Sequence, residues 1–435
     1  MVKKPQLKSV MSMGGRAMAS ISDQAAAAAV SFAVSIFVGR HIGVDALGIY
    51  AITNVFILLF RAFQNCLVLE PMSVFGPRVS ENYKEYFGFL VRIEIICVFA
   101  ASLLLALGAT VAHALAYIED NLFFAMLASC IYLNLVCFQY FLRRQFYVDH
   151  RQYLATIQSF SFLFLVIAGL AILWRVDGLS VVDIYMLLAG CSIVVCIIQG
   201  GRFWSQMGRP SAHNARNYLR DHWSYGKWML MAVPFSILTY QGFFAIVGFA
   251  ISSEAAGLLK AAEVFIGPFA QIVIGLQLML VPMASRTVDK MSLAQQKRFA
   301  MGIGLLFLSG SLVYAGIVYF AREYAVLMFF GEHMRDAIPI LAILALLPIF
   351  RGLPTAAGVI LAARKQANLR FVSQASSTIL SLMAAIPMIY YGGVLGAAAA
   401  MVMSQAVFAI TNWACVLWLW RRDKLSGVEA VATAT

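Results

Sequence analysis

Three basic residues stand inside long apolar stretches of this chain, where a charge is costly unless it binds or pairs with something. Arg61, Lys260 and Arg351 are these bases, and Glu263 is the acidic residue placed clearly inside with them. An interior with more cations than carboxylates attracts anions, so the chemistry indicated is anion binding. The alternative for each base is a structural ion pair. That alternative is strongest for Lys260, because Glu263 follows it by one helical turn.

Polar residues accompany these charges on the same helical faces. Arg61 shares a face of stretch 45–69 with two asparagines and a flanking glutamine, and Lys260 shares a face of stretch 255–281 with a second glutamine. Asp23 lies in stretch 17–39, near enough to one surface to be wetted. We predict Asp23 and Glu263 as coupling-ion carboxylates. The predicted substrate-binding residues are Arg61, Lys260, Arg351, Asn54, Asn65, Gln64 and Gln271.

The apolar runs define the class of protein. The chain is 62% hydrophobic and 12% charged, and each run of about 20 apolar residues suffices to cross a hydrocarbon core of about 30 Å. The sequence therefore predicts an all-α polytopic membrane protein with twelve transmembrane helices. The expected spans are 17–39, 45–69, 87–110, 120–142, 153–174, 181–200, 227–250, 255–281, 299–320, 337–361, 369–391 and 394–420.

An internal repeat divides these spans into halves. The stretch Gly39–Phe56 returns as Gly248–Phe265, with the identical pairs Gly39/Gly248, Ile42/Ile251, Ala46/Ala255, Gly48/Gly257, Val55/Val264 and Phe56/Phe265. An even number of spans returns each half to its starting side, which predicts two six-helix lobes related by a parallel pseudo-two-fold repeat. The predicted domains are an N-terminal lobe at 1–200, a cytoplasmic linker at 201–226, a C-terminal lobe at 227–424 and a flexible C-terminal tail at 425–435.

Loop charges predict the orientation. Lys and Arg gather on the side that carries both termini, in loops to which we assign Arg143, Arg144 and Arg151, and we place Arg92 and Glu94 at the membrane interface on that side. By the positive-inside rule both termini are cytoplasmic. The net charge of +12 is then a signal of topology and of contact with membrane lipids, and nucleic acid is not an expected partner. The opposite side receives only Arg40, Arg175, Arg322 and Arg335.

Enzyme signatures are absent from the sequence. It contains no GxSxG, Walker or HExxH motif, and its 7 cysteines lack metal-ligand spacing. We therefore expect no catalytic residues, no metal and no cofactor.

The stretch GRHIGVDALGIYAI after the first span, Pro71 closing the second, and a second six-helix half beginning near Gly226 carry a resemblance to a known family. The chain resembles the polysaccharide-exporting flippases of the multidrug/oligosaccharidyl-lipid/polysaccharide (MOP) exporter superfamily. The resemblance implies a multi-pass protein of the bacterial inner membrane that moves a lipid-pyrophosphate-linked oligosaccharide from the cytoplasmic to the periplasmic leaflet. It also implies two lobes around a cationic cavity, with Arg61 and Lys260 placed to meet a pyrophosphate.

Two other functions stay open at this point. A cation-coupled multidrug exporter of the same superfamily would favour an acidic cavity, whereas the interior bases here outnumber the acids. A non-transporting membrane scaffold for polysaccharide assembly would not need duplicated polar faces. The expected partners are a lipid-linked oligosaccharide substrate, membrane lipids and a polysaccharide polymerase or export complex.

Overall fold

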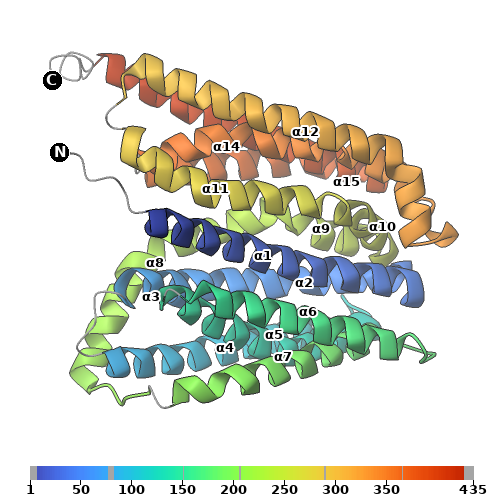
Figure 1. Ribbon diagram of the computed structural model, residues 1–435. Helices are drawn as coiled ribbons and strands as arrows, with labels where there is room; N and C mark the ends of the chain where they lie inside the picture. The colour runs from blue at the N-terminus through green and yellow to red at the C-terminus, as the bar shows by residue number, and fades with distance from the viewer. Residues whose placement is uncertain are drawn as a thin grey trace. The chain divides into compact units, whose positions relative to one another are not determined.

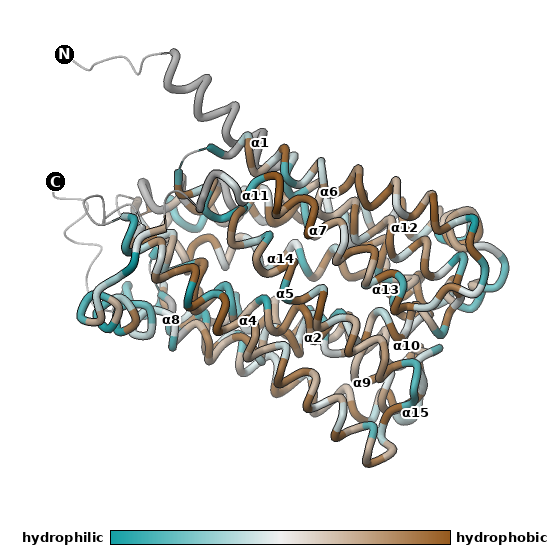
Figure 2. The backbone as a smooth tube through the Cα atoms, turned by 90° about the horizontal axis from the view of Figure 1, so that it is seen from below, coloured by the Kyte–Doolittle hydropathy of each residue, from teal (hydrophilic) through white to brown (hydrophobic). Residues whose placement is uncertain are grey.

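The computed structural model describes residues 7–76, 83–149, 151–204, 207–288, 291–364 and 366–425, and every element in these ranges is a helix. Backbone groups find no water in a bilayer, so apolar stretches satisfy them internally by forming helices. Figure 2 shows hydrophobic colour along most of the helices and hydrophilic colour where α8 begins. Residues 426–435 of the predicted tail and residues 205–206 of the predicted linker lie outside the described residues.

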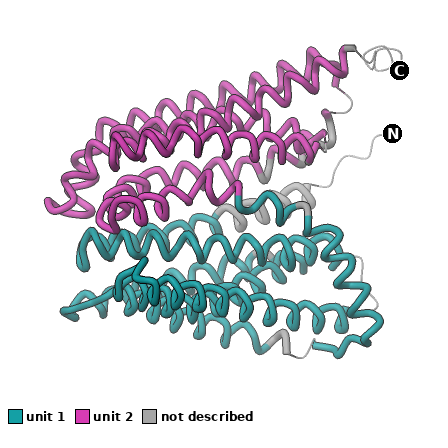
Figure 3. Tube along the Cα trace, turned by 180° about the vertical axis from the view of Figure 1, so that it is seen from behind, with its two compact units in different colours: residues 1–234 teal, residues 235–435 magenta. Residues whose placement is uncertain are grey.

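The chain forms two compact units, Met1–Pro234 and Phe235–Thr435, which Figure 3 colours separately. Figure 1 labels most of their helices. Unit 1 contains α1 (Leu7–Phe37), η1 (Val38–Ile42), α2 (Val44–Gln64), η2 (Asn65–Leu69), α3 (Glu70–Phe75), α4 (Tyr83–Ala114), α5 (Asp120–Val148), α6 (Gln152–Leu173), α7 (Val181–Trp204) and most of α8 (Ala212–Tyr240). Unit 2 contains the end of α8, α9 (Gly242–Ala250), α10 (Ser253–Val264), α11 (Gly267–Thr287), α12 (Leu293–Phe329), η5 (Glu332–Met334), α13 (Ala337–Leu344), α14 (Leu347–Ala363) and α15 (Ala367–Leu425).

The number of spans follows from these helices. Within the described residues, 9 helical stretches are long and apolar enough to cross a membrane, or 11 when each of two bent pairs is counted as one span. The bent pairs are Met229–Tyr240 with Gly242–Ala250, and Ser253–Val264 with Gly267–Gln277. Counting the long helix α15 twice then gives the predicted twelve.

Helix α15 is two antiparallel helices. Its 59 residues would extend about 90 Å as one straight helix, roughly three hydrocarbon thicknesses. The backbone leaves helical geometry at Gly393, with φ 54° and ψ −136°, and the two arms meet where Ser373 and Thr411 hydrogen-bond at 3.1 Å. A Cβ on Gly396 would lie 1.8 Å from the carbonyl oxygen of Met388, so only glycine permits the return. The predicted fold class is therefore confirmed in its helical content and number of spans.

We expect a reporter that is active only in the cytoplasm to give signal when fused after Arg364 or after Lys424, and none when fused after Gly393. The reason is that each arm of α15 is long enough to cross the membrane once, and the positive-inside rule predicts that the basic ends of the arms face the cytoplasm. Reporter activity normalised to the amount of fusion protein is the measurement. Equal signal at all three positions would show that α15 does not turn back at Gly393.

The sequence repeat corresponds to one structural feature in each unit. The offset that aligns Gly39 with Gly248 also aligns Val44, where α2 begins, with Ser253, where α10 begins. In unit 1 the preceding turn uses Gly43, whose φ of 127° suits glycine. In unit 2 the Ser252 hydroxyl caps α10 by accepting from the Ala255 amide. Both repeats thus fix the start of the second span of their unit.

The first part of α8 packs against η2 and α4 within unit 1. His222 is buried, and its Nδ1 lies 3.0 Å from the Leu67 carbonyl oxygen while its Nε2 lies 2.9 Å from the Tyr86 hydroxyl. A carbonyl only accepts, so Nδ1 carries the proton and donates. Burial lowers the pKa of His222, which favours this neutral ring. A Cβ on Gly226 would lie 2.5 Å from the Cys66 carbonyl oxygen, so α8 approaches the backbone of η2 closely.

Candidate functional site

Unit 2 brings three of the predicted site residues together. Lys260 and Glu263 lie one turn apart on α10, with Nζ 3.0 Å from Oε2, and both are buried. Arg351 enters from α14, with Nη2 3.9 Å from the other carboxylate oxygen of Glu263. The local i,i+3 pair follows from the helix itself. Arg351 joins this pair only because α14 packs close to α10.

This cluster, Lys260, Glu263 and Arg351, carries an excess positive charge. Two cations share one carboxylate, and the Arg351 contact at 3.9 Å is longer than a hydrogen bond. The Nε of Arg351 is buried and has no hydrogen-bond partner among the described residues. A guanidinium with unused donors in a dry site is suited to an incoming oxyanion. The cluster can therefore bind an anion.

Asp23 in unit 1 is fully buried and fully bonded. One of its oxygens accepts from Arg143 Nε at 2.8 Å, from Arg143 Nη2 at 2.5 Å and from the Tyr147 hydroxyl at 2.5 Å. Its other oxygen accepts from Ser159. These bonds tie α1 to α5 and α6. Asp23 is thus ion-paired and lies away from water.

The position of Arg143 differs from its predicted place in a cytoplasmic loop. Helix α5 continues to Val148 and buries the Arg143 side chain. The cause is the carboxylate of Asp23, which compensates the guanidinium inside the protein. Loop assignment from charge alone fails where a basic residue near the end of a span has a partner on another helix.

Tyr140 joins Arg61 to this pair. The guanidinium carbon of Arg61 lies 3.7 Å from the centre of the Tyr140 ring, and that of Arg143 lies 5.2 Å from it. Both distances fit cation–π contacts. Within the described residues Arg61 forms no ion pair with a carboxylate. Arg61, Arg143 and Asp23 therefore repeat in unit 1 the ratio of two cations to one carboxylate found in unit 2.

The remaining predicted residues serve different contacts. Gln64 is buried and donates to Glu94 and to the Cys137 carbonyl. Asn65 accepts from Arg144 at 2.9 Å. Asn54 on α2 and Gln271 on α11 are half-buried.

The position of Glu94 differs from the second of these predictions. The sequence predicts that Glu94 lies at the membrane interface, whereas its side chain is inside unit 1 with 1% of its surface exposed. Sequence reasoning also missed Tyr140, for which an aromatic residue three positions before Arg143 is the only signal.

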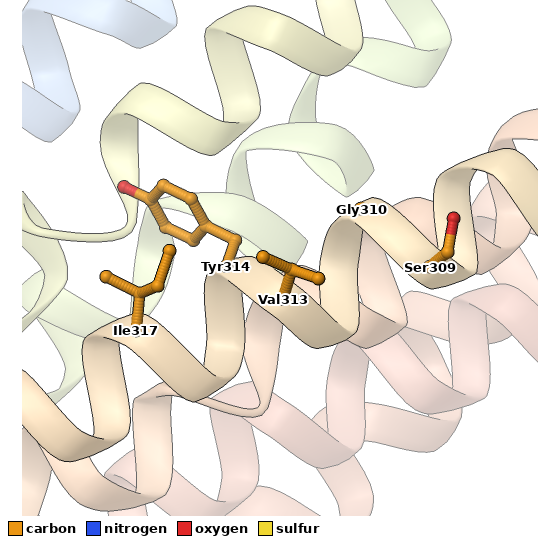
Figure 4. A pocket seen from close by; sticks show the side chains of 5 residues that line it. All are labelled: Ser309, Gly310, Val313, Tyr314 and Ile317. Carbon is orange, nitrogen blue, oxygen red and sulfur yellow. The ribbon is translucent and has the colours of Figure 1, made fainter.

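A separate hollow of about 340 Å³ lies along α12, lined by Ser309, Gly310, Val313, Tyr314 and Ile317 (Figure 4). None of these residues is charged. Tyr314 donates to the Phe265 carbonyl at 2.8 Å, at the break between α10 and α11. The hollow is therefore apolar and distinct from the charged cluster.

No protein-family model and no curated protein sequence matches the chain. Solved structures do match over nearly its whole length. An inward-facing multidrug resistance MATE family transporter of the MOP superfamily has a TM-score of 0.77 at 12% identity, covering 92% of this chain and 95% of its own. The lipid II flippase MurJ in an inward closed conformation has a TM-score of 0.72 at 10% identity, covering 92% and 87%. The Vibrio cholerae MATE transporter VcmN in its bent form has a TM-score of 0.65 at 14% identity, covering 95% and 98%.

The chain is therefore a multi-pass membrane protein with a membrane-transporter fold. More particularly, that fold is the one shared by MATE transporters and the lipid II flippase MurJ. The predicted resemblance is confirmed in its fold, and identities this low concern the fold alone.

Proposed function

We propose that this protein is a flippase that moves a lipid-pyrophosphate-linked oligosaccharide from the cytoplasmic to the periplasmic leaflet of a bacterial inner membrane, for the biosynthesis of an exopolysaccharide, capsule or O-antigen. It acts as a transporter and not as an enzyme. Both termini lie in the cytoplasm, and a polysaccharide polymerase or export complex receives the product.

The observation that carries this proposal is the charge of the unit 2 cluster. Lys260 and Arg351 share Glu263 alone, and Arg351 Nε has no partner among the described residues. A pyrophosphate offers several oxygens to such donors, and arginine binds them through two parallel hydrogen bonds. Arg61 in unit 1, whose guanidinium lies on the Tyr140 ring, is likewise proposed to bind pyrophosphate. We also propose that four polar residues assist in binding the substrate: Asn54, Asn65, Gln64 and Gln271.

The fold supports a multidrug exporter equally, since MATE transporters and MurJ both share it. The sign of the buried charge supports the flippase over the exporter. A site for cationic drugs needs an accessible carboxylate without a basic partner. Glu263 and Asp23 are each paired with a cation, and Glu94 is closed to a ligand, with 1% of its surface exposed. These two residues remain the coupling carboxylates predicted from the sequence. Glu263 is the better placed of the two, because Asp23 is held by four hydrogen bonds.

Reconstitution of the purified protein into liposomes tests the proposal. We expect it to move a fluorescent lipid-pyrophosphate-linked oligosaccharide between leaflets, measured by the access of an impermeant quencher to the glycan label. We expect no accumulation of a cationic dye under the same ion gradients. Dye accumulation without movement of the glycan would favour the multidrug exporter, and movement of neither would favour the scaffold.

A further inference from the structure

Glu94 is a buried carboxyl group without a cation. It lies on α4 with 1% of its surface exposed, and its Oε1 accepts from Gln64 Nε2 at 2.6 Å. Its Oε2 is buried and has no hydrogen-bond partner among the described residues. Asp23 and Glu263, by contrast, both have basic partners.

The groups around Glu94 do not compensate a negative charge. The ionisable groups near enough to feel its charge are the thiols of Cys97 on α4 and Cys137 on α5, and neither is a cation. Arg61 on α2 is near enough for its charge to influence Cys137, but its guanidinium lies against the Tyr140 ring. No basic group among the described residues lies within ion-pair distance of Glu94. A carboxylate buried without a cation is strongly disfavoured, and such a group instead takes up a proton.

The hydrogen bonds of Gln64 indicate where that proton goes. Gln64 Nε2 donates to Glu94 and, at 2.7 Å, to the carbonyl oxygen of Cys137, which uses both of its N–H groups. Its Oε1 is buried and unpartnered, as is Glu94 Oε2. A proton on Oε2 makes that oxygen a donor, and the free oxygen of the same amide is an acceptor. One proton on Oε2 thus removes the uncompensated charge and supplies a donor to a site where two acceptor oxygens lack one.

We propose that Glu94 is a proton-binding site and that its protonation and deprotonation couple protons to transport. Gln64 is the last residue of α2, immediately before η2, and its amide joins α2 to α4 and α5. Loss of the proton leaves a buried anion without a cation beside the one hydrogen bond that joins Glu94 to Gln64. It therefore favours a conformation in which this end of α2 separates from α4. The proton-binding claim is independent of the cargo, and only the coupling claim rests on the proposed function.

Infrared spectroscopy of the purified full-length protein tests proton binding without any cargo. We expect a carbonyl band of a neutral carboxylic acid at neutral pH. Glu94→Gln should abolish the band, while Asp23→Asn and Glu263→Gln should leave it. Gln64→Leu should keep the band but move it to higher frequency, because the acid loses its hydrogen-bonded amide. Absence of the band in the wild type, or its persistence in Glu94→Gln, would overturn the proposal.

A second arm tests coupling in liposomes. A proton gradient should accelerate translocation of the lipid-linked oligosaccharide by the wild type, and Glu94→Gln should lose this acceleration while retaining the rate measured without a gradient. An unchanged response to the gradient in Glu94→Gln would overturn the coupling role. If no cargo moves in the wild type, the proposed function fails, whereas the infrared result still decides proton binding.

Discussion

Export of glycan per molecule of inserted protein is expected to fall roughly 30- to several thousand-fold in Arg61→Ala. The loss corresponds to about 2–5 kcal/mol for removing a charge-assisted contact to a buried anion. Arg61→Lys should be partly active, because lysine keeps the charge but loses the bidentate geometry and the contact of the guanidinium with the Tyr140 ring. Arg61→Gln should resemble the alanine variant. The measurement is export in cells, normalised to the protein found in the membrane.

Arg175→Ala is the control for this series, since Arg175 is exposed in the connection after α6. It should export at the wild-type rate. Wild-type export by Arg61→Ala would contradict a role for Arg61 in anion binding. A fall in the amount of inserted Arg61→Ala, with normal export per molecule, would assign Arg61 to packing against Tyr140.

Arg143→Ala is expected to lower the free energy of unfolding by about 3–5 kcal/mol, because it leaves the buried charge of Asp23 uncompensated. Asp23 has none of its surface exposed, and Arg143 supplies two of its four hydrogen bonds. Unfolding of the detergent-purified protein by denaturant, followed by circular dichroism, measures the change. Adding Asp23→Asn to the Arg143→Ala variant should restore most of the stability, because the neutral amide needs no counter-ion.

The matched control for that variant is Arg335→Ala. Arg335 also pairs with carboxylates, Glu323 and Glu332, but its side chain is 63% exposed. Exposed ion pairs contribute about 0–1 kcal/mol, so this variant should be nearly as stable as the wild type. Equal stability of Arg143→Ala and Arg335→Ala would show that Asp23 does not depend on its arginine.

The sequence was sufficient for features that depend on local periodicity. Apolar length predicted the spans, and the spacing of Lys260 and Glu263 predicted their ion pair, because an α-helix places positions i and i+3 together. The repeat at Gly39–Phe56 located the start of the second span in each half. These inferences need no knowledge of which helices pack together.

The charged partners from distant helices could not be predicted in this way. Arg351 meets Glu263 only because α14 packs near α10, and Arg143 meets Asp23 only because α5 packs near α1. The sequence position of Glu94 near the end of a span predicts an interfacial residue, whereas Glu94 is buried and bonded to Gln64 from α2. In each case the missing information was the tertiary pairing of helices.

The central claim, that the excess buried positive charge binds a pyrophosphate, is tested most directly by equilibrium binding to the purified protein. The ligands are a polyprenyl lipid that carries a pyrophosphate and the same lipid ending in an alcohol, each measured with the wild type and with Arg351→Ala. We predict that the wild type binds the pyrophosphate lipid far more tightly than the alcohol. We also predict that Arg351→Ala weakens pyrophosphate binding at least about 30-fold and leaves alcohol binding unchanged. Equal affinity of the wild type for the two lipids would contradict the claim.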